Sequence, residues 1–350
     1  GYNVYYRKTK LNEDYNVNNY VTDSYGGSLS FGYPIDENQS LSASLGIDKT
    51  KVRTGPSVST YIRDYLLANG GKETHRSAEY CRVELEPIKN EQGEITGYKP
   101  CPEDQTYTFA DQFEGDFLTY MLNLGWSYNT LNRPIFPTSG MSHRVGLEVG
   151  LPGSDVEYQK VTYDAQAFMP LGNNFVLRGY GKLGYGNDLP FYKNFYAGGY
   201  GSVRGYENST LGPKYPSVIF QETGKNDPNL EEVGGNALVQ FGTELAIPLP
   251  FKGDWTRQVR PVVFAEGAQV FDTQCDVPKG DLLVDGNSVD IKQYCKDNYK
   301  FDFGNMRYSV GVGFTWITMI GPLSLSYAYP LNDKKGDVTK SIQFEIGRTF

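Results

Sequence analysis

The sequence lacks any apolar run of about 20 residues, the length that a membrane-spanning helix requires. Its mean hydropathy is −0.48, a value that by itself would suit a soluble protein. These properties exclude a helical membrane protein. They leave a membrane β-barrel open, because only every second residue of a barrel strand faces lipid.

Residues that carry chemistry are also scarce. The two histidines, His75 and His143, have no obvious Ser or Asp partner by spacing, and no CxxC pair suggests zinc. The 33 basic and 41 acidic residues give a net charge of −8, without a basic footprint for nucleic acid. The segment Gly179–Gly184 matches G-x-G-x-x-G, but strand alternation runs through it and no helical period follows. We predict no catalytic residues, metal, cofactor or nucleic-acid partner.

Only four cysteines occur, and they form two neighbouring pairs that are each 20 residues apart in polar regions. Four cysteines allow three connectivities. Local pairing of Cys81 with Cys101 and of Cys275 with Cys295 is favoured, because each bond would close one loop. Free thiols are the alternative. Disulfides would indicate an oxidising compartment, such as the periplasm or the cell surface.

Alternating sequence is abundant, and the C-terminal segment shows it best. Ile342, Phe344, Ile346 and Phe350 share one parity, while Gln343, Glu345, Gly347 and Thr349 share the other. Period-two alternation indicates a strand with one apolar and one polar face. Lipid on one side and a polar lumen on the other would suit both faces. The 40 Gly, 28 Tyr and 19 Phe residues agree with barrel curvature and interfacial aromatic girdles.

Twelve strands can be predicted, most of them from alternation. They cover Tyr2–Lys10, Tyr25–Pro34, Leu41–Asp48, Phe117–Leu131, Met141–Pro152, Tyr158–Pro170, Phe175–Gly186, Asn236–Pro250, Val259–Phe271, Met306–Trp316, Pro322–Pro330 and Ile342–Phe350. Long connections alternate with short ones along the chain, as in outer-membrane barrels with long extracellular loops. A soluble sandwich is the alternative, but it gives no reason to place all long loops at one end. Within the first long loop, Val58–Ala68 allows a short surface helix.

The long segment Asn187–Gly235 contains Phe195–Tyr206, which reads FYAGGYGSVRGY. Its aromatic residues, glycines and single central Arg204 favour an ordered loop folded into the lumen. A buried Arg needs carboxylate partners. Glu244 and Glu266 are inward-facing candidates, and the guanidinium can bind carboxylate in a bidentate way that Lys would not reproduce. The alternative is that Arg204 is a solvated loop residue.

Val203, Arg204, Gly205 and Tyr206, preceded by Phe195–Gly199, resemble the VRGF/Y loop signature of the BamA family. This family supplies the central subunit of the outer-membrane β-barrel assembly machinery. The resemblance covers nearly the whole chain outside the two cysteine loops. The further stretches that match in order are Leu131–Gly140, Gly153–Tyr158, Gly212–Lys214, Gly234–Ala237, Gly321–Leu323 and the C-terminal strand.

The resemblance implies an all-β, antiparallel barrel in the bacterial outer membrane, with residues 1–350 as one partial transmembrane domain. The family barrel has sixteen strands and follows periplasmic POTRA domains. This chain has no POTRA-like segment, and Gly1 falls near the fifth strand, so we expect a truncated barrel. In the family, the signature loop (187–235 here) enters the lumen, and its Arg contacts two carboxylates. Those positions match Glu244 and Glu266, although the family pattern has Asp at the second.

The resemblance also implies an insertase that folds β-barrel proteins into the outer membrane without covalent chemistry. Its partners would be unfolded barrel clients, outer-membrane lipids and lipoproteins that bind mainly to POTRA domains. The C-terminal strand, with Ile342, Phe344, Ile346, Gly347 and Phe350, would be both one side of a seam and an assembly signal. A two-partner secretion or TamA-type transporter is the alternative, and a passive porin or surface receptor barrel is more remote.

Overall fold

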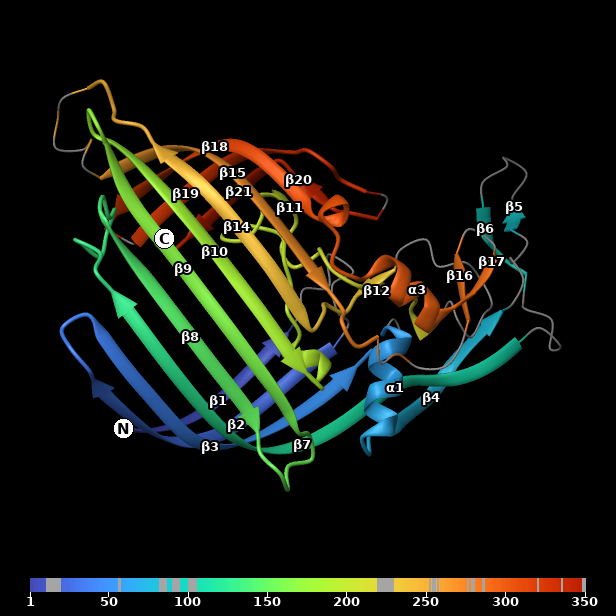
Figure 1. The fold of residues 1–350 in the computed structure, drawn as a ribbon. Helices are drawn as coiled ribbons and strands as arrows, with labels where there is room; N and C mark the ends of the chain where they lie inside the picture. The colour runs from blue at the N-terminus through green and yellow to red at the C-terminus, as the bar shows by residue number, and fades with distance from the viewer. Residues whose placement is uncertain are drawn as a thin grey trace.

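The computed structural model describes most of the 350 residues. Residues outside the description are 11–19, 56–57, 82–86, 90–94, 100–105, 219–229, 252, 254–255, 257, 276, 278–280, 285–286, 320, 335 and 348–350. The described chain is dominated by one strongly curved antiparallel sheet, whose strands cross Figure 1 diagonally.

Twelve strands pair in sequence order in this sheet, which confirms the predicted number. Each neighbouring pair is antiparallel, as expected for a barrel wall. The strands are β1 (Tyr2–Lys10), β2 (Tyr20–Pro34), β3 (Gln39–Thr54), β7 (Thr106–Asn129), β8 (Gly140–Gly150), β9 (Tyr158–Gly172), β10 (Phe175–Asn187), β14 (Ala237–Ala246), β15 (Val259–Phe271), β18 (Arg307–Thr318), β19 (Gly321–Pro330) and β21 (Ile342–Ile346).

The alternation that predicted the strands is visible in their burial. In β19, Ser324, Ser326 and Ala328 are buried on the concave side, while Leu325, Tyr327 and Tyr329 are exposed on the convex side. The G-x-G-x-x-G stretch lies entirely within β10, as its alternation predicted. The convex face therefore carries an apolar surface of the kind that meets lipid in a membrane barrel.

Strand ends account for most differences from the prediction. β7 begins eleven residues before the expected Phe117, because its first half pairs with β4 (Lys72–Cys81) in an arm that leaves the sheet. β14 ends at Ala246 rather than Pro250, in a segment where Pro248 and Pro250 have no N–H to donate. β21 is described only to Ile346, after which Gly347 has a φ of +85°. The expected strand end at Phe350 lies outside the described residues.

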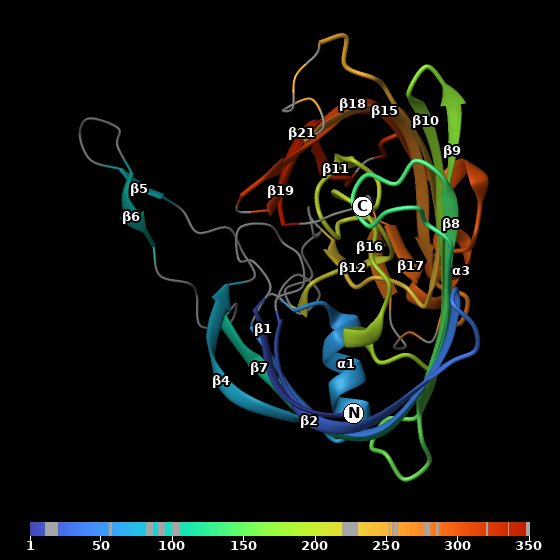
Figure 2. The same ribbon diagram turned by 90° about the vertical axis from the view of Figure 1, so that its left-hand side faces the viewer.

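The long connections gather at one end of the sheet and the short turns at the other (Figure 1). Figure 2 shows the arm with β4 extending away from the sheet on the same side as β5 and β6. The remaining elements all lie in these connections. They are α1 (Thr60–Ala68), β5 (Pro87–Lys89), β6 (Ile95–Tyr98), the 3₁₀ helix Phe191–Lys193, β11 (Gly205–Tyr206), β12 (Lys214–Tyr215), β13 (Glu231–Glu232), β16 (Asp281–Val284), β17 (Asn287–Asp290), α3 (Ile291–Asn298), the 3₁₀ helix Phe303–Asn305 and β20 (Thr339–Lys340).

An apolar core fills the concave side near the long connections. Val203 and Tyr206 from the segment before β14 pack there with Phe117 of β7. The helix expected at Val58–Ala68 forms as α1, but its placement on the surface was wrong: Ile62 and Leu66 are fully buried in the same core. The physical reason is that its apolar side chains meet an apolar surface supplied by distant segments. No described helix is long and apolar enough to cross a membrane.

Candidate functional site

The described part of the segment between β10 and β14 lies on the concave side of the sheet in both views of the fold (Figures 1 and 2). Backbone pairs within the segment shape it, including Phe195 N–H to Gly235 O at 2.8 Å and a bridge between Ala197 and Leu211. A side chain on Gly184, on the inner face of β10, would collide with the Phe195 ring at 2.5 Å. This glycine therefore gives the segment room to approach the wall. We call Phe195–Tyr206 the motif loop.

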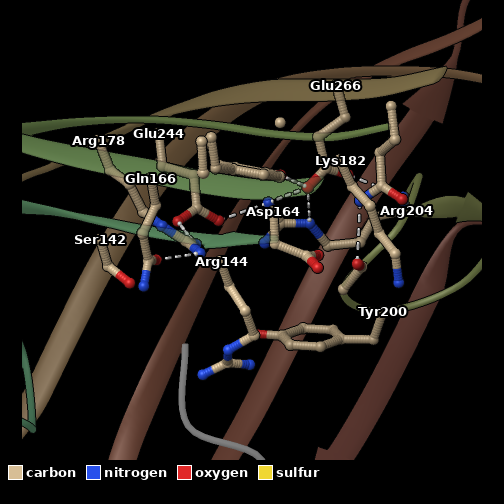
Figure 3. Close-up of a pocket in the computed structure, with 15 residues that line it drawn as sticks. Ser142, Arg144, Asp164, Gln166, Arg178, Lys182, Tyr200, Arg204, Glu244 and Glu266 are labelled. Carbon is tan, nitrogen blue, oxygen red and sulfur yellow. Dashed lines mark hydrogen bonds and ion pairs between the residues drawn. The ribbon is translucent and has the colours of Figure 1, made fainter. Parts of the chain in front are cut away.

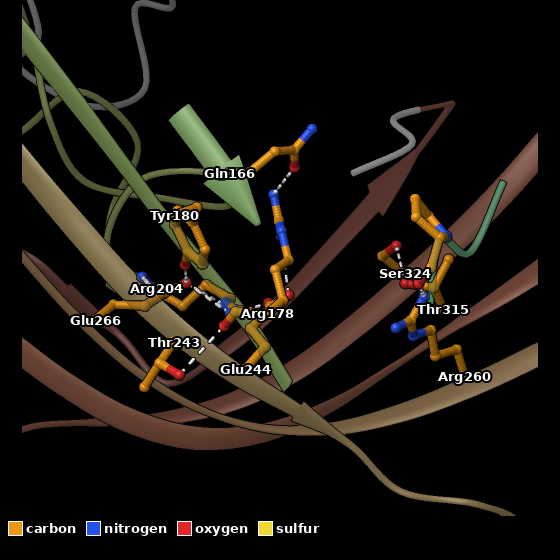
Figure 4. Close-up of polar contacts among 12 residues, drawn as sticks. Gln166, Arg178, Tyr180, Arg204, Thr243, Glu244, Arg260, Glu266, Thr315 and Ser324 are labelled. Atoms are coloured by element: carbon orange, nitrogen blue, oxygen red, sulfur yellow. Dashed lines mark hydrogen bonds and ion pairs between the residues drawn. The ribbon is translucent and has the colours of Figure 1, made fainter. Parts of the chain in front are cut away.

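Arg204 is the central charge of the motif loop and is only 2% exposed. Its backbone N–H donates to Glu266 Oε2 at 2.8 Å, and its Nε and Nη2 donate to Glu266 Oε1 at 2.9 and 2.5 Å. Nη2 also donates to Glu244 Oε1 at 2.6 Å. The structure thus brings together the three charged residues that the sequence singled out, which Figure 4 shows.

The electrostatics of this site keep Arg204 charged. Burial alone would lower the pKa of Arg204, but the carboxylates of Glu266 and then Glu244 raise that pKa above its ordinary value. The guanidinium carbon also lies 3.4 Å from the ring centroid of Phe264, a cation–π contact. A buried ion pair adds little to the free energy of unfolding when it is compared with a well-packed apolar pair. Removing one partner, however, is strongly destabilising, because the other charge stays buried without compensation. The site is therefore suited to holding the loop in one position.

The neighbours of Arg204 have equally specific roles. Val203 is fully buried in the apolar core. Gly205 has a φ of +95°, a conformation that favours glycine, and a Cβ there would lie 3.3 Å from Cβ of Ala328. The Tyr206 hydroxyl donates to the carbonyl of Tyr308 on β18 at 3.3 Å. Burial, together with Asp337, raises the pKa of Tyr206 to about 12. Val203 thus anchors the motif in the core, while Arg204, Gly205 and Tyr206 approach the inner side of the wall.

Sequence reasoning missed two members of the site, Arg178 and Tyr180 of β10. Arg178 Nη1 donates to Glu244 Oε2 at 2.9 Å, and its Nη2 donates to Gln166 Oε1 at 3.0 Å. The Tyr180 hydroxyl donates to Glu266. Arg178, Tyr180 and Lys182 share one parity, and this signal was available. The glycines of the same stretch drew attention away from it.

The ion pairs border a polar cavity of about 450 Å³ in the sheet's interior. Figure 3 shows residues of both charge signs around it, among them Arg144, Asp164 and Lys182. Arg204, Glu244 and Glu266 also line the cavity, beside Tyr200 of the motif loop. Because charges of both signs line the cavity, it offers no surface of a single sign to a ligand.

The structure also describes the C-terminal strand and one of the two predicted disulfides. In β21, Ile342, Phe344 and Ile346 are exposed on the convex side, and β21 pairs with β19 from Leu323–Ile346 to Tyr327–Ile342. Gly347 N–H still donates to Pro322 O at 2.9 Å, while Phe350 lies outside the description. Cys275 and Cys295 form the predicted disulfide, which joins α3 to the segment after β15. The predicted Cys81–Cys101 bond falls outside the described side chains.

The fold, the inner loop and the buried arginine define a family of membrane β-barrels. The Omp85 superfamily domain matches residues 1–350, so the chain belongs to the Omp85 superfamily and is an integral β-barrel protein of the outer membrane. Within this superfamily its sequence is similar to that of BamA, which confirms the expected resemblance.

Two relatives and one solved structure illustrate this similarity. The outer membrane protein assembly factor BamA of Neisseria meningitidis serogroup B is 34% identical over 343 residues, 93% of this chain and 41% of that protein. The mouse sorting and assembly machinery component 50 homolog is 27% identical over 259 residues, 70% of this chain and 49% of that protein. The crystal structure of Haemophilus ducreyi BamA lacking POTRA domains 1–3 matches with a TM-score of 0.73 and 28% identity, over 100% of this chain and 58% of that chain. This chain therefore spans less than half of these two relatives.

Proposed function

We propose that this chain is the membrane part of an insertase that folds other β-barrel proteins into the outer membrane. The observation that carries the proposal is the contrast between a wall braced by Arg204 on Glu244 and Glu266 and a last strand, β21, whose described ladder with β19 has five residue pairs. One part of such a barrel would stay fixed while another offers a strand to a client.

The physical difficulty of insertion is that unpaired backbone N–H and C=O groups of a client strand would meet hydrocarbon. An edge strand such as β21 would act as a template, because a client strand that pairs with it satisfies these groups during entry. The proposed reaction is non-covalent. The proposed partners are unfolded outer-membrane β-barrel clients, surrounding outer-membrane lipids and the lipoproteins of the assembly machinery.

Photo-crosslinking can test where a client enters. Phe344 on β21 and Phe241 on β14 are both exposed on the convex side, so they form a matched pair of positions. Each variant would carry a photoreactive phenylalanine at one of these positions. The purified variant would be reconstituted in vesicles and illuminated while an unfolded barrel client folds. We expect client adducts from position 344 and none from position 241. Equal yields at both positions would contradict a seam at β21.

Channel recordings of the same vesicles separate this proposal from a passive porin. The motif loop and its ion pairs occupy the interior of the sheet, so we expect low conductance. Steady, large conductance together with absent client adducts would favour the porin. A two-partner secretion or TamA-type transporter shares a loop of this kind, and it would release its substrate across the membrane rather than leave a folded barrel in it.

A further inference from the structure

The second half of the motif binds the C-terminal part of the chain, a contact that the sequence did not predict. Gly205 and Tyr206 form β11, which pairs antiparallel with β20 through Gly205–Lys340 and Tyr206–Thr339. The next N–H, of Glu207, donates to the carbonyl of Val338 at 2.8 Å. The ladder therefore lies immediately before β21, which begins at Ile342.

Gln343 of β21 adds a side-chain contact to this ladder. It points to the concave side and is 5% exposed, between the outward-facing Ile342 and Phe344. Its Nε2 donates to the carbonyl oxygen of Tyr206 at 2.6 Å, and this bond is buried. Directly after the motif loop, Glu207 Oε2 lies 3.0 Å from Nζ of Lys340. The end of the loop and Glu207 thus contact β20 and β21 through backbone pairing, a side-chain hydrogen bond and an ion pair.

We propose that Gln343 is a positioning residue that fastens the last strand of the sheet to the motif loop. Arg204 is bound to β14 and β15, and Tyr206, two residues later, is bound to β21. A displacement of the loop at Arg204 would therefore pull directly on the strand. This inference rests on the proposed function only for the role of β21 as a template for client strands. The attachment of β21 to the loop does not depend on that role.

The attachment matters because β21 has few other contacts. Its described ladder with β19 runs over five residue pairs, whereas β14 and β15 share ten. The bond from Gln343 is buried, and a buried carbonyl left without its donor loses more than an exposed one. Within the described residues, Gln343 Oε1 and the hydroxyl of Ser326, its neighbour on β19, have no hydrogen-bond partner. The amide N–H is therefore the polar contact through which the Gln343 side chain is held.

Hydrogen exchange followed by mass spectrometry can test the attachment in the absence of any client. Gln343→Leu keeps the side-chain size and removes the donor. We expect amides of Ile342–Ile346 and of Tyr206–Glu207 to exchange about ten-fold faster, the effect of losing one buried hydrogen bond. Lys340→Gln, which removes a partly exposed ion pair, should accelerate the same amides about two-fold. The milder variant keeps the test informative where Gln343→Leu does not fold.

Gln240→Leu is the matched control. Gln240 of β14 also donates from Nε2 to a carbonyl of the motif loop, that of Gly201, at 3.1 Å. We expect this variant to accelerate exchange near Gly201 and to leave Ile342–Ile346 unchanged. Unchanged exchange of Ile342–Ile346 in both Gln343→Leu and Lys340→Gln would overturn the proposal, as would equal acceleration by Gln240→Leu.

A separate insertion assay keeps the two proposals distinguishable. If the wild-type chain inserts no client while Gln343→Leu frees β21, the proposed function fails and the attachment stands. If the wild-type chain inserts clients while exchange of β21 is unaffected by either variant, the attachment fails and the proposed function stands. Exchange reports the fastening, and the folded client reports the insertase.

Discussion

The wall formed by β14 and β15 differs sharply from the two ends of the sheet. Each of these inner strands has a neighbour on both sides, and each supplies one carboxylate to Arg204. β1 and β21 end the strand order, and each pairs with one strand among the described residues. A strand edge without a partner presents free backbone donors and acceptors. The proposed function needs both regions, a fixed wall and a strand edge that would accept a client strand.

The comparison shows where polar groups are useful inside a barrel. On the inner wall, charge is buried and paired, which fixes the loop at the cost of desolvation. At β21, the described ladder with β19 covers five residue pairs, and the contact with the motif loop is a hydrogen bond from the neutral Gln343 rather than a buried charge. Buried ion pairs and neutral hydrogen bonds are thus placed on different strands, and the motif loop touches both.

The sharpest test of this comparison asks whether the two ends of the sheet meet. Cysteines placed at Tyr2, Val4 or Tyr6 would be combined with cysteines at Ile342, Phe344 or Ile346 and oxidised. We expect no intramolecular disulfide, because β1 and β21 are not paired among the described residues. Cysteines at Tyr6 and Tyr25, which are register partners, should crosslink. An efficient β1–β21 bond would show that the sheet closes through these strands.

The next largest effect is expected at the braced wall. Arg204→Ala leaves Glu244 with Arg178 but leaves Glu266 without a cation among its described contacts. We expect a loss of about 3–5 kcal/mol in unfolding free energy, measured by urea titration and by heat-modifiable mobility on gels. Arg204→Lys should recover little, because an ammonium group cannot reproduce the branched contacts of the guanidinium.

Two further variants sharpen this prediction. Arg53→Ala removes an ion pair with Asp23 at a partly exposed position and should lose far less stability than Arg204→Ala. Glu266→Gln in the Arg204→Ala background should restore part of the stability, since it removes the unpaired charge. A loss at Arg204 no larger than that at Arg53 would contradict the bracing role.

The sequence predicted the number and order of the sheet strands because their alternation is local. The inner and outer faces of β19 and β21 follow directly from residue parity. The lengths of β7 and β3 could not be predicted in this way, since they depend on pairing with β4 and on contacts outside the lipid-facing region. The burial of α1 likewise depends on a surface made by distant segments.

The candidate site was predictable only in part. Arg204 stood out as a lone cation in an aromatic, Gly-rich loop, and Glu244 had clear inward parity. Arg178 and Tyr180 had the same parity but no unusual composition, so their contacts emerge only when β10 and β14 are aligned in register. The pairing of Gly205 and Tyr206 with β20 joins segments more than 130 residues apart, and no local pattern encodes it.

The smallest predicted effects on stability concern two tyrosines. Tyr180 of β10 bonds to the braced wall, and Tyr206 of the motif loop bonds to β18, nearer the end of the sheet. The Tyr180 hydroxyl donates to the carboxylate of Glu266, while the Tyr206 hydroxyl donates to a backbone carbonyl of β18 at 3.3 Å. Hydrogen bonds to charged groups contribute about 1.5–3 kcal/mol, and neutral ones about 0.5–1.5 kcal/mol. Tyr180→Phe should therefore destabilise the barrel more than Tyr206→Phe in urea titrations. The reverse order would show that the loop depends more on β18 than on the Arg204 ion pairs, and the contrast between the two regions would then fail.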